Sequence, residues 1–106
     1  MPAELRYTTK EARPGDTIEY QIVNHGPETL TFGEPYVLER LDGDGWVECN
    51  EETTWTVPLV ELRPGHERTE WAHIPRDGAP GRYRVTKEVT AGELDEVLSF
   101  ELDVVA

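Results

Sequence analysis

The segment "GRYRVTKEV", from Gly81 to Val89, decides the fold class. It is short, it is rich in β-branched residues, and it begins at a Pro-Gly pair, which is typical of a turn. Tyr83, Val85 and Lys87 lie two residues apart, so in an extended chain their side chains share one face. We therefore expect a β-strand here rather than a helix.

The rest of the chain has the same character. Alternating or β-branched segments recur at roughly the 8–12 residue spacing that is typical of all-β proteins. No window keeps the i, i+3, i+4, i+7 apolar pattern of a helix without an interrupting Pro or Gly. We expect extended segments at 5–10, 17–24, 29–32, 36–41, 46–49, 53–57, 59–62, 67–74, 82–89 and 94–105.

Three short motifs predict the turns between these strands. "RPGD" (13–16) and "RPGH" (63–66) each place Pro where φ is fixed and Gly where φ is positive. "DGDG" (42–45) is a strong hairpin signal. Strands without helices, joined by short turns, fold as a sandwich or a barrel.

Tyr83 favours one of these two folds. In immunoglobulin-like sandwiches, a tyrosine near the start of strand F lies two residues before the inter-sheet cysteine. Its hydroxyl donates a hydrogen bond to the backbone just upstream. Here Val85 takes the place of the cysteine, and Tyr20 or Ile22 on the facing strand would pack against it. The sequence predicts an all-β, immunoglobulin-like β-sandwich of two antiparallel sheets with about seven to nine strands and Greek-key connections. It forms one domain over residues 1–106, in which Tyr83 is structural.

Longer stretches of the chain resemble one family. "RPGDTIEYQIVNHGPETLTFGEPYVLERLDGDGWVE", "LRPG" and "PGRYRVTKEV" are similar, in this order, to the bacterial immunoglobulin-like domains of Gram-positive bacteria and their relatives. The similarity runs from about Arg13 to Phe100. It implies an accessory module without a catalytic constellation, in a family with many exported members.

The resemblance also suggests a polar pair. Glu39 lies in the Leu-Glu strand and Lys87 in the Tyr-Arg strand, and strands C and F are neighbours in the immunoglobulin order. Lys87 shares the apolar face of its strand, where an unpaired ammonium group is costly. We therefore expect a salt bridge between Glu39 and Lys87.

The charge of the chain limits its partners. Twenty-two acidic residues against ten basic ones give a net charge of −12. Such a chain repels nucleic acid and anionic membrane surfaces, and it contains no apolar run of the roughly 18 residues that span a bilayer. We expect a protein partner, with a basic one favoured by charge. The open sheet edges of a sandwich also allow a homodimer.

Cys49 is the single cysteine, so no intrachain disulfide forms and a reducing compartment is allowed. The opening residues lack the basic and apolar regions of a signal peptide. We expect a cytoplasmic protein if the chain is full length, and an extracellular or cell-envelope one if it is an excised domain.

Nucleophiles and metal ligands are sparse in the sequence. Ser99 lies mid-strand without a neighbouring histidine, and Cys49 has no local catalytic signature. A hydrolase would need a cleft that joins one of them to a histidine. His25, His66 and His73 follow no known metal-ligand spacing. Asp42 and Asp44 begin like a calcium loop but lack its later ligands, which favours a hairpin and leaves a weak cation site as an alternative. No catalytic residue, metal or cofactor is predicted.

Three tryptophans remain as candidates for ligand contact. Trp46 follows the hairpin and is expected to face the core. Trp55 and Trp71 are the candidates for exposed contacts with a ligand or partner. The sequence thus predicts a non-enzymatic interaction or spacer module, with a carbohydrate-binding module that uses exposed tryptophans as the alternative.

Overall fold

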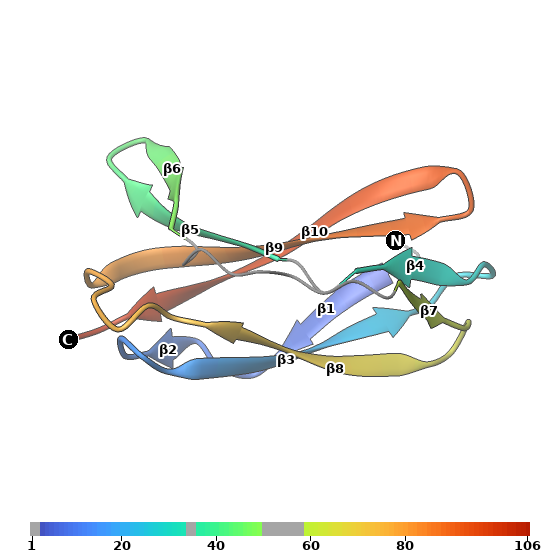
Figure 1. The fold of residues 1–106 in the computed structure, drawn as a ribbon, viewed down its shortest axis with the longest axis horizontal. Coiled ribbons are helices and arrows are strands. Elements are labelled where there is room, and N and C mark those ends of the chain that lie inside the picture. The colour runs from blue at the N-terminus through green and yellow to red at the C-terminus, as the bar shows by residue number, and fades with distance from the viewer. Residues whose placement is uncertain (1–2, 34–35, 50–58) are drawn as a thin grey trace.

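Two β-sheets lie face to face in the computed structural model, which describes residues 3–33, 36–49 and 59–106 (Figure 1). The described residues form ten strands and no helix. The strands are β1 (Ala3–Tyr7), β2 (Glu11–Ala12), β3 (Thr17–Asn24), β4 (Leu30–Phe32), β5 (Val37–Asp42), β6 (Gly45–Glu48), β7 (Val60–Leu62), β8 (Glu67–His73), β9 (Gly81–Ala91) and β10 (Leu94–Val104).

The smaller sheet has the order β1-β3-β8, with both pairs antiparallel. The larger sheet has the order β2-β10-β9-β4-β7, and the hairpin of β5 and β6 joins it through β9. β4 and β5 pair with opposite ends of β9. The chain passes to the larger sheet after β3, returns to the smaller one at β8 and crosses again to β9. These crossings make the fold a sandwich rather than a row of hairpins.

Most of the predicted strands are present, with ends that move by one to three residues. The N-terminal segment differs, because it forms two strands in different sheets. β1 pairs with β3, and β2 then pairs in parallel with β10. An alternating pattern shows which side chains are buried but not which sheet a strand joins, so it could not predict this division. The predicted strand at 53–57 lies outside the described residues.

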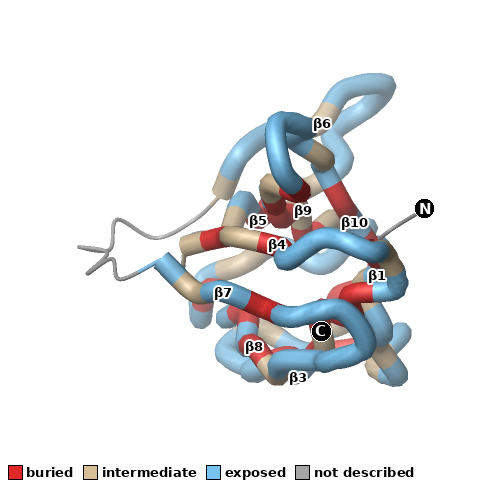
Figure 2. Tube along the Cα trace, turned by 90° about the vertical axis from the view of Figure 1, so that its right-hand side faces the viewer, coloured by how far each residue is buried: buried red, intermediate tan, exposed pale blue. Residues whose placement is uncertain are grey.

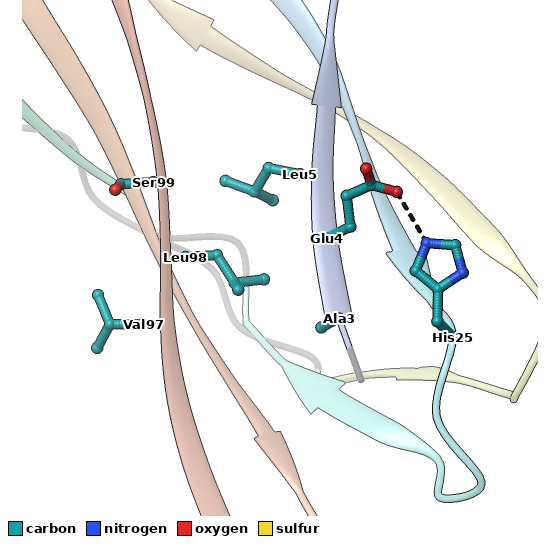
Figure 3. Close-up of a pocket in the computed structure, with 7 residues that line it drawn as sticks. All are labelled: Ala3, Glu4, Leu5, His25, Val97, Leu98 and Ser99. Carbon is teal, nitrogen blue, oxygen red and sulfur yellow. Dashed lines mark hydrogen bonds and ion pairs between the residues drawn. The ribbon is translucent and has the colours of Figure 1, made fainter. Parts of the chain in front are cut away.

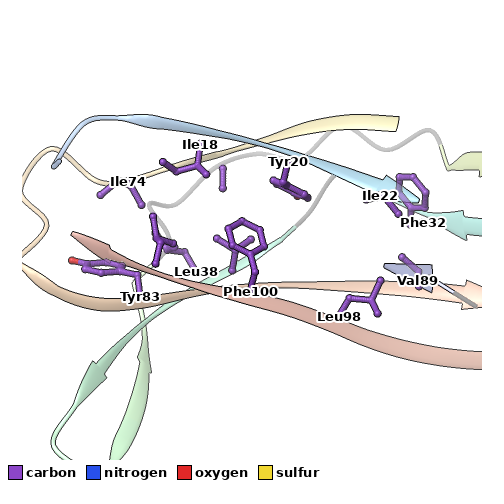
Figure 4. Close-up of a cluster of buried hydrophobic side chains, with 14 of the residues drawn as sticks. Ile18, Tyr20, Ile22, Phe32, Leu38, Ile74, Tyr83, Val89, Leu98 and Phe100 are labelled. Atoms are coloured by element: carbon purple, nitrogen blue, oxygen red, sulfur yellow. The ribbon is translucent and has the colours of Figure 1, made fainter. Parts of the chain in front are cut away.

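The core is built from residues of both sheets, and Figure 2 marks the buried positions on their strands in red. Ile18, Tyr20 and Ile22 of β3 are buried from one side, as their alternation predicts. Val85 of β9 and Phe100 of β10 are buried from the other side. The rings of Tyr20 and Phe100 lie 5.4 Å apart, and Figure 4 shows them facing each other across the layers.

The two Arg-Pro-Gly motifs form matching turns. Gly15 has φ 88° and Gly65 has φ 80°, the left-handed region that favours glycine. In each turn, the backbone N–H of the fourth residue donates to the carbonyl of the first, from Asp16 to Arg13 and from His66 to Arg63. The turns therefore close as the sequence predicts.

Candidate interaction site

β10 has an open edge along most of its length. On one side it pairs with β9 from end to end. On the other side, among the described residues, it pairs only with the two residues of β2, opposite Asp103 and Val104. Asp103 and Val105 donate their N–H groups toward the β2 segment. The N–H and C=O groups of successive residues point to opposite sides of a strand. Val97 and Ser99 lie an even number of residues from Asp103, so their N–H and C=O groups also point to this open edge.

A groove runs between the open edge of β10 and the edge of β1 (Figure 3). Its volume is about 540 Å³, and its walls come from Ala3, Glu4 and Leu5 of β1, Val97, Leu98 and Ser99 of β10, and His25. Leu5 and Leu98 point toward each other across the gap, whereas Val97 and Ser99 point to the outer face of β10. The groove thus has an apolar floor at Leu5 and Leu98 and a backbone edge whose hydrogen-bonding groups have no partner among the described residues.

A second hollow, of about 250 Å³, lies on the outer face of the larger sheet. Tyr36, Val37, Thr86, Glu88 and Val97 line it. Val97 is 61% exposed and borders both the hollow and the groove. Large exposed apolar side chains beside a free strand edge are features of contact surfaces. The sequence showed that Val97 and Ser99 share an outer face, but it could not show that, among the described residues, β10 pairs on its second side only with the two residues of β2.

Ser99, His25 and Glu4 border the same groove, which is the arrangement that a hydrolase hypothesis requires. Their geometry does not form a catalytic triad. Nε2 of His25 donates to Oε1 of Glu4 at 2.8 Å, but no hydrogen bond in the described part of the chain joins His25 to Ser99. The Ser99 side chain points away from β1 (Figure 3). A nucleophile must lie within hydrogen-bond reach of its base, so this cluster does not activate Ser99.

The contact between His25 and Glu4 predicts a measurable titration. The hydrogen bond from His25, together with the nearby Arg6, lowers the pKa of Glu4 below its ordinary value, against a smaller opposing effect of burial. A carboxyl group with a lowered folded-state pKa stabilises the fold above its unfolded pKa, and this contribution disappears as the pH falls through the folded pKa. In the variant H25A, we expect the Glu4 side-chain carbon to titrate at higher pH by NMR. An unchanged midpoint would contradict the assigned cause.

Lys87 and Glu39 do not form the predicted salt bridge. Glu39 pairs in register with Arg84, three residues from Lys87, so the two side chains lie on opposite faces of the sheet. Glu39 accepts from Nη2 of Arg84 at 2.9 Å. Lys87 is fully buried and contacts Glu70 of β8 instead, at 3.3 Å, and donates to the carbonyl of Gly33 at 2.6 Å. The need for a partner was predicted correctly, but the partner comes from the facing sheet.

Trp46 and Trp71 belong to different sheets. Trp46 does not face the core as predicted, because the β5–β6 hairpin extends away from the sandwich (Figure 1). Its half-buried ring instead lies under the guanidinium of Arg84, 4.3 Å from the ring centre. Trp71 is 52% exposed on the outer face of the smaller sheet, opposite Glu19. Trp55 lies outside the described residues.

Tyr83 is buried, and its hydroxyl donates to the carbonyl of Ala79 at 2.7 Å. This is the backbone contact, four residues upstream, that a tyrosine corner makes. The Val85 side chain that follows belongs to the core with Tyr20 and Ile22. The corner therefore fixes the loop that enters β9.

The fold class and this corner agree with a match to a known family. Residues 3–103 match the family described as the bacterial Ig-like domain. The chain belongs to this family. The match extends beyond the stretch that suggested the resemblance, and it includes β1 and most of β10.

This chain spans half or less of the length of the relatives described below. A neutral ceramidase of Mycobacterium tuberculosis is 29% identical over 93 residues, which are 82% of this chain and 14% of that protein. A family 123 glycoside hydrolase from Clostridium perfringens has a similar fold, with TM-score 0.54 and 15% identity over 99% of this chain and 27% of its own. The sporulation control protein Spo0M of Bacillus subtilis has TM-score 0.52 and 11% identity over 100% of this chain and 50% of its own. The two structural likenesses show the fold alone.

Other candidate groups of this Ig-like domain are separate from the groove. Burial raises the pKa of the Cys49 thiol, whose Sγ donates to the carbonyl of Leu38 at 3.5 Å. Asp42 and Asp44 lie at the hairpin turn, and the described ranges hold no cluster of three or more residues that could bind a metal. No helix in the described part of the chain is long and apolar enough to cross a membrane.

Two buried tyrosines give a matched pair of predictions. The Tyr83 hydroxyl has a partner, whereas the buried Tyr20 hydroxyl has none among the described residues. Burial raises the pKa of both phenols. Y83F should lower the free energy of unfolding by about 1 kcal/mol, while Y20F should be neutral or stabilising because it removes an unsatisfied group. Urea unfolding of both variants tests this contrast, and equal losses would contradict it.

Proposed function

We propose that this Ig-like domain is a non-catalytic module that binds another protein through the β10 side of the sandwich. The observation that carries this proposal is the exposed Val97, which separates the groove from the outer hollow beside a free strand edge. A surface with a groove and an apolar hollow on the two sides of a strand edge that is open among the described residues suits a protein segment better than a small polar substrate.

The geometry of the nucleophiles supports the non-catalytic part of the proposal. Ser99 points away from the His25 and Glu4 pair, and the Cys49 thiol has a raised pKa, which disfavours the reactive thiolate. Among the described residues, neither group has the activating neighbour that covalent catalysis requires.

Site-specific photo-crosslinking in the source organism tests the proposed contact face. A photoreactive residue at Val97 should give a discrete crosslink to one protein. A photoreactive residue at Ser99 should give a crosslink to the same protein, and adding V97D to that chain should abolish it. The matched control places the probe at Thr69, on the outer face of the smaller sheet, where no such product should form. Equal crosslinking at both positions, or none at Val97, would refute the assigned face.

A carbohydrate-binding function is the second candidate, because Trp71 offers an exposed indole with polar neighbours. Glu19 lies opposite it in β3, and Thr17 and His73 hydrogen-bond to each other nearby at 3.0 Å. An exposed aromatic face beside polar groups can stack on a sugar ring. A glycan array should then show binding that W71A removes and W46A retains. No bound glycan, or binding that survives W71A, would reject this function.

A further inference from the structure

We infer that the open edge of β10 accepts an extended, basic segment of the partner protein as an additional strand. This inference rests on the proposed function and specifies how the partner binds. The segment would lie beside the outward edge of residues 94–102 and would end where β2 begins to pair with β10. Main-chain hydrogen bonds would supply affinity, and the hollows on the two sides of the edge would supply specificity.

The backbone groups are correctly placed for strand addition. The N–H and C=O groups of Val97 and Ser99 face the open edge, as do those of Asp95 and Glu101, which have the same parity along the strand. The N–H and C=O groups of the intervening residues face β9, with which β10 is already paired. An added strand would therefore complete the ladder of the larger sheet without breaking an existing bond.

The two sides of the edge select different side chains. On the inner side, the groove with Ala3, Leu5 and Leu98 would take apolar side chains of moderate size. On the outer side, the side chains of Asp95 and Glu101 lie beside the added strand. The matching sequence alternates apolar and basic residues, so that one lysine or arginine lies next to Asp95 and another lies next to Glu101.

Charge also separates a basic partner from a second copy of the chain. β10 carries four acidic residues and no basic one, in a chain of net charge −12. If two β10 edges paired antiparallel with Val97 opposite Ser99, Asp95 of one copy would lie opposite Glu101 of the other. Like charges directly opposite each other destabilise a strand pair. Arg82 neutralises part of this charge at one end, through contacts of 3.4 Å to Glu101 and 3.2 Å to Asp103.

A designed peptide tests the inference on the intact chain. The probe is a capped nine-residue peptide that alternates lysine and valine, and its control replaces each lysine by glutamate. Calorimetry should detect binding of the lysine peptide alone, and D95N/E101Q should weaken it by about fivefold because two charge pairs are lost. Equal binding of both peptides, or no binding of either, would overturn the inference.

The variant S99P separates strand addition from unspecific charge attraction. Proline at an edge position removes only the outward N–H, which β9 does not use, so the sheet should tolerate it. S99P should weaken binding of the lysine peptide by about tenfold, whereas S99A, which keeps the N–H, should bind like the native chain. Unchanged binding by S99P would refute the strand-addition mode.

Hydrogen exchange on the native chain provides a readout that does not depend on the folding of S99P. Saturation with the lysine peptide should slow exchange of the amides of Val97 and Ser99, which point outward, and leave those of Leu98 and Phe100 unchanged. Exchange that is unaltered at Val97 and Ser99 would contradict the mode.

If these peptide tests fail while the Val97 crosslink persists, the module binds a protein in another way. If the peptide tests and the crosslink both fail, the proposed function fails as well. A dimer detected by light scattering with protected β10 amides would instead assign the edge to a second copy.

Discussion

Replacing Glu70 by leucine should destabilise the protein by about 3 kcal/mol, because it leaves the Lys87 ammonium buried without the carboxylate that faces it. Lys87 has an exposed fraction of 0%, and Glu70 is buried at 8%. The 3.3 Å contact between them joins β9 of one sheet to β8 of the other. The measurement is the free energy of unfolding in urea, with the slope compared to exclude a change in the denatured state.

A control and a double variant distinguish the loss of this ion pair from a simple packing defect. E67L removes a carboxylate from the same strand, but Glu67 is exposed and lies 3.6 Å from the exposed Arg6. Its effect should stay within about 1 kcal/mol. The double variant E70L/K87M should recover much of the loss, because apolar pairs can replace a buried ion pair. A double variant as unstable as E70L would contradict this explanation.

The variant N24L should also cost about 3 kcal/mol, because it removes three hydrogen bonds of about 1 kcal/mol each. Asn24 is fully buried at the end of β3. Its amide nitrogen donates to the carbonyl of Glu28 at 2.8 Å and to that of Leu62 at 2.9 Å, and its oxygen accepts from the N–H of Gly26 at 3.0 Å. One side chain thus ties the turn after β3 to the end of β7.

The half-buried Gln21 offers a matched control in the same strand. Q21L makes the same polar-to-apolar exchange away from these turns, so its effect should be within about 0.5 kcal/mol. Thermal unfolding of both variants gives the comparison. If N24L and Q21L shifted the melting temperature equally, the amide would not hold the two loops together. We expect N24L to expose the 24–28 turn to faster hydrogen exchange as well.

The fold could be predicted from the sequence to a large extent because local rules dominate it. The alternation of Ile18, Tyr20 and Ile22 fixed the buried face of β3, and the Arg-Pro-Gly motifs fixed two turns through the φ angles of their residues. Tyr83 indicated the tyrosine corner that leads into β9. Its hydroxyl bonds to a carbonyl only four residues upstream, so this contact is local in sequence. Each of these features depends on residues within a few positions of one another.

The candidate site could not be predicted in the same way. The open edge of β10 depends on where the chain between β1 and β2 changes sheets, and the groove depends on the gap that this change leaves. The hydrogen bond of His25 to Glu4 joins residues that are 21 positions apart. No local pattern specifies such a gap, because it results from the packing of two sheets.

The sequence by itself determined that the chain is a β-sandwich, where most of its strands lie and that Lys87 must have a buried partner. These properties follow from side-chain alternation, turn chemistry and the cost of burying a charge. Only the tertiary structure decided that this partner is Glu70 rather than Glu39, that Trp46 lies on a projecting hairpin and that β10 keeps a free edge. The physical reason is that period-two alternation determines only which face of the strand a side chain occupies. Its contact partners come from the facing sheet, and long-range packing decides which residues of that sheet lie opposite it.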